Sequence, residues 1–190
     1  MPSDTIIDGV DYGPLTALVG RWRGDKGLDV SPEPDGDEQN PYFETIVFEA
    51  IGEVTNAERQ KLAALRYHQV VSRKSTGEVF HNESGYWSWD AAEGLVVQTL
   101  TIPRGVSLVA GGTAQQSGEG VELNVSAGDG NQDWGISQSP FMRDHARTTG
   151  FTHSISTAND TLTYSETTQL EIYGRSFAHT DANTLTRDDG

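Results

Sequence analysis

The sequence predicts an all-β protein, an antiparallel up-and-down barrel of about ten strands. Segments of alternating apolar and polar residues recur along the chain, and they are rich in β-branched and aromatic side chains. Short clusters of glycine, asparagine and aspartate separate these segments, as in hairpin turns. So many strands joined by short turns favour closure into a barrel, because closure removes the exposed edges of a long sheet.

Length and composition set the limits of the prediction. The 190 residues fit one domain, and we expect a single barrel over residues 1–190 with its core at 15–187. The formal net charge of −15 disfavours nucleic acid and anionic membrane partners. No apolar run is long enough to span a membrane, no secretory signal is visible, and we expect a cytoplasmic protein. Whether it forms a homodimer is left open.

The first half of the chain predicts a strand, a long loop and two further strands. A strand opens at Gly20–Gly24, and Asp25–Pro41, with three prolines and several acids, is expected to be a loop at one rim. Phe43–Val54 and Leu62–Arg73 follow as strands. Residues 55–58 match a helix capping box, but the β-favouring residues that soon follow make a strand the preferred prediction.

The second half predicts a run of hairpins with one irregular interruption. Asn131–Asp144 contains tryptophan, proline and phenylalanine, so we expect it to be irregular but partly packed. The strands expected around it are Val79–Trp89, Leu95–Ile102, Val106–Gly111, Val121–Ala127, Arg147–Thr157, Thr161–Ile172 and Arg175–Arg187.

A glycine–tryptophan motif opens the first strand. Gly20-x-Trp22-x-Gly24 resembles the opening of the lipocalin and fatty-acid-binding superfamily, in which the tryptophan plugs the closed end of the barrel. The resemblance implies that Arg187, near the end of the last strand, lies across the indole ring. An indole face is the best cation–π acceptor among side chains, so the pair is expected to be structural.

Four further segments resemble nitrobindin-like proteins, a haem-binding β-barrel family. They are His81–Trp87, Pro103–Gly105, Leu162–Tyr164 and the surroundings of His179. The resemblance implies a barrel that holds ferric haem b through His179, with the other side of the iron open to nitric oxide or peroxynitrite. Whether the protein is an enzyme, a peroxynitrite isomerase, is left open.

Strand alternation predicts the neighbours of this histidine. Phe177, His179, Asp181 and Leu185 share one face of their strand. If His179 faces inward, Asp181 could orient its imidazole, or could make the interior too polar for a porphyrin. Alternatively, His179 is a structural residue beside a turn.

A second hypothesis involves no iron. Arg66 and His68 share a face, and an inward arginine would require a carboxylate partner, so the barrel could carry a fatty-acid-like molecule. Solvent exposure of both residues is the alternative. Arg143 or His145 could approach haem propionates by resemblance, and a cavity filled by side chains is a third possibility. No cysteine nucleophile, nucleophile elbow or phosphate-binding loop is present.

Overall fold

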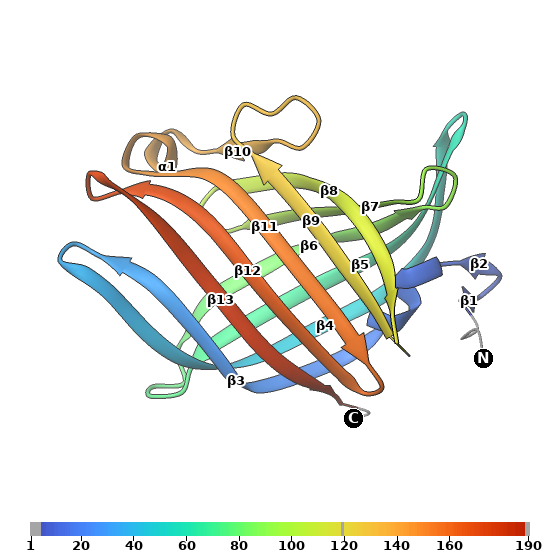
Figure 1. Ribbon diagram of the computed structural model, residues 1–190, viewed down its shortest axis with the longest axis horizontal. Helices are drawn as coiled ribbons and strands as arrows, with labels where there is room; N and C mark the ends of the chain where they lie inside the picture. The colour runs from blue at the N-terminus through green and yellow to red at the C-terminus, as the bar shows by residue number, and fades with distance from the viewer. Residues whose placement is uncertain (1–4, 119, 189–190) are drawn as a thin grey trace.

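Ten antiparallel strands close into a barrel in the computed structural model, which describes residues 5–118 and 120–188 (Figure 1). Each strand pairs with its neighbours in the chain, and the last strand pairs with the first, so the predicted barrel is confirmed. The strands are β3 (Gly20–Glu33), β4 (Gly36–Ala57), β5 (Gln60–Arg73), β6 (Val79–Asp90), β7 (Leu95–Ile102), β8 (Val106–Ser117), β9 (Gly120–Gly128), β11 (Ala146–Ala158), β12 (Thr161–Ile172) and β13 (Arg175–Arg187).

Short elements lie at the two ends of the barrel. The 3₁₀-helix η1 (Gly13–Leu18) lies at the end where β3 begins and β13 finishes, and the helix α1 (Pro140–His145) lies at the other (Figure 1). Neither they nor any other helix in the described part of the chain is long and apolar enough to cross a membrane. The remaining short strands are β1 (Ile6–Ile7), β2 (Val10–Asp11) and β10 (Ile136–Gln138).

The prediction of a loop over Asp25–Pro41 is wrong. Strands β3 and β4 run through this segment and pair out to Glu33 and Gly36. Here the usual polarity of a barrel strand is reversed, because Leu28 faces solvent and Asp29 is buried inside. Because a polar residue occupies the inner face, the segment lacks the apolar–polar alternation from which strands are predicted. The capping box at residues 55–58 lies at the β4–β5 turn and starts no helix.

A tryptophan and an arginine close the η1 end. Trp22 is fully buried, and its indole Nε1 donates a hydrogen bond to the carbonyl oxygen of Leu18 at 2.7 Å. The guanidinium of Arg187 lies 4.2 Å from the centroid of the Trp22 ring and also donates to the carbonyl oxygens of Ala17 and Val19. Gly20 has a φ of +126°, and a Cβ there would lie 2.7 Å from the guanidinium. The glycine therefore makes room for the arginine that joins the two ends of the barrel.

The interior is solid near this plug. Trp22, Leu15 and Leu18 pack there against inward side chains of the surrounding strands, and all are fully buried. Together they form an apolar core in one half of the barrel, and the polar interior side chains lie beyond it toward α1. The fully buried partners of the plug from the strands include Leu65, Trp87, Leu123, Ile155, Leu162 and Leu185.

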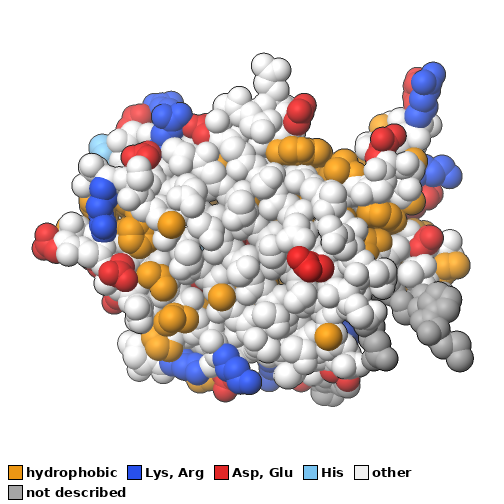
Figure 2. Space-filling model, viewed as in Figure 1, with side chains coloured by type: hydrophobic (Ala, Val, Ile, Leu, Met, Phe, Trp, Pro, Cys, Tyr) orange, Lys and Arg blue, Asp and Glu red, His pale blue; other side chains and the backbone are white. Residues whose placement is uncertain are grey.

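The outer surface over β9, β11, β12 and β13 carries few charged side chains (Figure 2). Outward positions on these strands hold exposed hydroxyl residues such as Thr152, Thr163 and Thr186. Acidic and basic side chains gather instead around the margins of this face (Figure 2). The formal charge of −15 is thus unevenly distributed over the molecule.

We expect Arg187→Ala to lower the free energy of unfolding by about 1–3 kcal/mol. The substitution removes the cation–π contact and leaves two backbone carbonyls without their donor. Urea unfolding monitored by tryptophan fluorescence measures the change. Arg66→Ala, which removes an exposed ion pair on the outer surface, is the matched control and should change little. Equal losses for the two variants would contradict a structural role for the plug.

Candidate functional site

A cavity of about 500 Å³ occupies the half of the barrel nearer α1. This volume lies within the range of pockets that hold small molecules and cofactors, about 300–1,000 Å³. Met142 of α1 and Arg104 of the β7–β8 turn line it, together with inward residues of most strands. The interior is therefore hollow where the apolar core ends.

The cavity has an apolar wall. β7 and β8 supply Leu100, Ile102, Val106 and Leu108, and β11 adds Phe151. None of these side chains can hydrogen-bond to a ligand, so this wall contributes through apolar contact alone. Most of the polar and charged side chains of the lining come from β3, β5, β6, β12 and β13.

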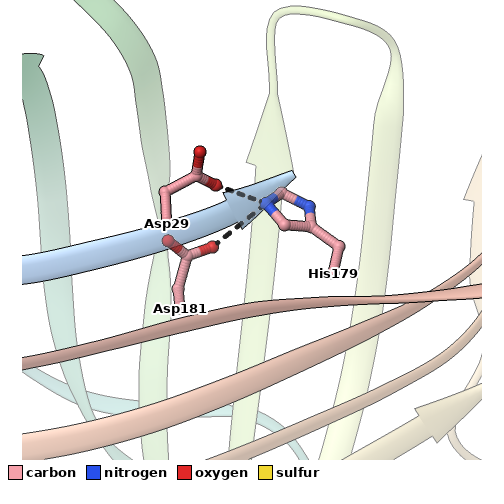
Figure 3. A group of neighbouring side chains, drawn as sticks. All are labelled: Asp29, His179 and Asp181. Atoms are coloured by element: carbon pink, nitrogen blue, oxygen red, sulfur yellow. Dashed lines mark hydrogen bonds and ion pairs between the residues drawn. The ribbon is translucent and has the colours of Figure 1, made fainter. Parts of the chain in front are cut away.

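His179 of β13 projects into the cavity between two carboxylates (Figure 3). Its Nε2 lies 2.6 Å from Asp29 Oδ1 and 3.4 Å from Asp181 Oδ2. Asp29 comes from β3, is 4% exposed, and also accepts a hydrogen bond from Asn40. Burial alone would lower the pKa of His179, but the hydrogen bond that it donates to Asp29 and the negative charges of Asp181 and Asp29 outweigh burial and raise that pKa. The imidazole is thus held by its ring nitrogen Nε2.

Three carboxylates lie side by side across neighbouring strands. Asp29 on β3 is directly opposite Asp181 on β13, which is directly opposite Glu166 on β12. We call Asp29, Asp181 and Glu166 the carboxylate belt. Burial raises the pKa of Asp181 to about 6, and burial with repulsion from nearby acids raises that of Glu166 well above its usual range. Like charges directly opposite on adjacent strands destabilise a sheet, so this arrangement is costly unless it is compensated.

A hydrogen-bonded chain runs from the cavity into the barrel. His81 Nε2 lies 3.4 Å from Glu83, and Glu83 accepts a hydrogen bond of 2.5 Å from the Tyr67 hydroxyl. Gln98 donates to that hydroxyl through Nε2, so its Oε1 accepts from Nδ1 of His153 at 3.0 Å. The Nε2 of His153 is then a buried lone pair, with no partner among the described residues. Burial lowers the pKa of His153 to about 4, so this imidazole is neutral at pH 7.

Glu44 on β4 is a further buried acid, close to the base of the cavity. It accepts hydrogen bonds from Asn183 at 2.6 Å, Gln69 at 2.7 Å and Tyr164 at 3.1 Å. Burial is the largest influence on its pKa, which rises to about 7 despite these donors. Sequence analysis did not single out Glu44, because a glutamate in an alternating strand is normally expected to face solvent.

The predicted site residues of β13 occupy the expected strand, at different depths. His179 and Asp181 line the cavity, whereas Phe177 does not. Phe177 lies toward the start of β13, where the guanidinium of Arg175 stacks 5.1 Å from its ring centroid. The structure thus brings two of these predicted residues, His179 and Asp181, together at the cavity. Asp29 was missed because its segment was expected to be a loop.

Arg66 and His68 lie on the outer surface, which corrects the expectation that they line the pocket. Arg66 is paired with Glu49, and its side chain is 59% exposed. His68 bonds to Asn82 at 3.0 Å. The inward positions of β5 are the alternate ones, where Leu65 is fully buried. Arg66 therefore cannot hold a ligand carboxylate inside the barrel, and the fatty-acid hypothesis loses the residue on which it was based.

Arg143 and His145 on α1 also point away from the cavity. Arg143 pairs with the adjacent Asp144, and the ring of His145 lies 4.8 Å from that of Phe141. The arginines that line the cavity are Arg73 and Arg104. Sequence analysis could not exclude Arg143 and His145 as lining residues, because the segment before β11 has no strand alternation from which the direction of a side chain can be predicted.

Comparison with known proteins identifies the family. A family model described as a THAP4-like, heme-binding beta-barrel domain matches residues 11–187, which confirms the nitrobindin-like resemblance. The crystal structure of Rv2717c from M. tuberculosis is similar, with a TM-score of 0.69 and 26% sequence identity, covering 92% of this chain and 94% of that one. No curated protein sequence matches.

We expect the free energy of unfolding to fall as the pH rises from about 4.5 to 7. In this window folded Glu44 keeps a proton that the unfolded chain releases, so the folded state loses its advantage with rising pH. A shift from 4.5 to about 7 corresponds to about 3 kcal/mol from this residue. Asp181 and Glu166 act in the same direction and outweigh His153, whose lowered pKa of about 4 acts in the opposite direction. Urea unfolding at pH 5 and pH 7.5 measures the dependence.

Glu44→Gln should remove this share of the pH dependence, because glutamine does not ionise. Glu49→Gln on the outer surface is the matched control and should retain the wild-type dependence. If Glu44→Gln titrates like the wild type, Glu44 is not the buried acid that the contacts describe.

Proposed function

The chain belongs to the family of THAP4-like, haem-binding β-barrel domains, and we propose that its cavity binds ferric haem b with His179 as the axial ligand. The observation that carries the proposal is the position of His179. It projects into a cavity of about 500 Å³, with a carboxylate bonded to one ring nitrogen. Metal-ligating histidines in proteins commonly have their second nitrogen held in this way.

The lining supports a haem-sized ligand on three counts. The aliphatic residues of β7 and β8 form an apolar wall against which a porphyrin can pack. Arg104 lines the cavity and forms no salt bridge with the described residues, so it is free to pair with a propionate. Nε2 of His179 donates its hydrogen bond to Asp29, which leaves Nδ1 as the ring nitrogen without a hydrogen bond in the described structure.

Haem would supply an iron centre that binds nitric oxide and could act as a Lewis acid in converting peroxynitrite to nitrate. Acidic and basic side chains both face the cavity: the carboxylate belt and Glu83 are accompanied by Arg73 and Arg104. The charges of the lining therefore do not discriminate between a neutral ligand and an anion. We propose nitric oxide binding as the activity of the haem-bound barrel, with isomerisation of peroxynitrite as a second one.

His81 is a hydrogen-bond donor that lines the cavity and is available to a small molecule there. Burial alone would lower its pKa, but Glu83 outweighs burial and raises it, which favours the protonated ring. A protonated His81 holds a proton within the cavity that it can share with a bound molecule. Its role is therefore to orient a ligand.

We expect purified protein titrated with haemin to give a shifted Soret band at a ratio of one haem per chain. His179→Ala should lose the shift or bind at least about tenfold more weakly, because the axial bond is removed. His68→Ala, a histidine on the outer surface, is the matched control and should behave like the wild type. An unchanged spectrum for His179→Ala would exclude His179 as the ligand.

A further inference from the structure

The carboxylate belt presents an electrostatic problem that the described side chains do not solve. Its three members lie in register on adjacent strands and face one cavity. His179 is the one basic side chain within salt-bridge distance of Asp29 and Asp181 in the described structure. A single imidazolium can balance one carboxylate, so negative charge is left in a partly buried space.

The spacing of the ligand atoms suits a metal ion. One atom each from Asp29, His179 and Asp181 lies within 4.8 Å of the other two, with His179 Nε2 central to the group (Figure 3). Oxygen and nitrogen ligands bind zinc at roughly 2.0–2.2 Å, which places ligand atoms about 3–3.5 Å apart. The observed distances of 2.6 and 3.4 Å from Nε2 need only a small adjustment to reach that spacing.

Glu166 supplies a separate indication that a ligand belongs here. It lines the cavity, its side chain is only 17% exposed, and it accepts no hydrogen bond within the described structure. The imidazole of His153 lies 3.8 Å away, but it is neutral at pH 7, and its own Nε2 is buried without a partner among the described residues. A buried carboxylate without a donor is unfavourable, and a bound cation would satisfy it.

We propose that the haem-free barrel binds one divalent first-row cation, such as Zn²⁺, through Asp29, Asp181 and His179. Glu166, next in the belt, completes the site directly or through water. The mixed nitrogen and oxygen donor set favours zinc, manganese or ferrous iron over calcium, which prefers oxygen ligands alone. The site shares His179 with the proposed haem function but does not depend on it. Cation and haem therefore compete for the same imidazole.

The test is calorimetric titration of haem-free protein with Zn²⁺. We expect one saturable site, and a rise in Tm of roughly 5–10 °C when the free ion exceeds its dissociation constant 100-fold. Asp181→Asn should weaken binding at least about tenfold, since even second-shell losses cost 10–100-fold. Glu166→Gln, a change on the other side of the belt, should weaken it less. Asp144→Asn, an exposed aspartate on α1, is the matched control and should bind like the wild type.

Three results would overturn the proposal: no saturable binding by the wild type, wild-type affinity in both Asp181→Asn and Glu166→Gln, or tighter binding of Ca²⁺ than of Zn²⁺. Thermal melts of the ion-free variants identify any that fail to fold. If one of Asp181→Asn and Glu166→Gln fails to fold, the zinc affinity of the other decides whether the proposal stands. The haem proposal can be tested separately from the cation proposal, because Asp181→Asn should keep the Soret shift with haemin but lose zinc binding. Zinc binding without haem uptake would contradict only the haem proposal. Haem uptake without zinc binding would contradict only the cation proposal.

Discussion

The pairing of the last strand with the first is the contact on which the rest of the molecule depends. It turns an open sheet into a ring and places Asp181 directly opposite Asp29, with His179 in reach of both. Without this seam neither the cavity nor the histidine site exists. The stack of Arg187 on Trp22 secures the seam at its closed end, where the guanidinium also bonds to backbone carbonyls.

The barrel separates stability from binding along its length. Large apolar side chains fill the half beside η1, and this packing provides most of the burial. The other half contains acids and histidines whose burial is unfavourable, around a space that can accept a ligand. The costly residues are tolerated because the apolar half is stable enough to hold them in position, a common relation between scaffold and site.

Much of the fold could be predicted from the sequence, and less of the site. The Gly20–Trp22 motif and the turn-punctuated strands are local signals, so the barrel and the place of His179 could be predicted. Asp29 was hidden because a buried acid contradicts the alternation of a strand, and Glu44 was hidden for the same reason. The side of β5 that faces inward, and hence the fate of Arg66, depends on register, which a single sequence leaves open.

The seam joins residues that lie far apart in the chain: the His179–Asp29 bond spans 150 positions. Contacts of such separation carry the largest entropic cost of chain closure and tend to form late in folding. The histidine and its carboxylates therefore come together only when the whole polypeptide has been threaded into a ring. A ligand bound there would stabilise only the completed barrel. Nascent or truncated chains, which lack part of the site, would not bind it.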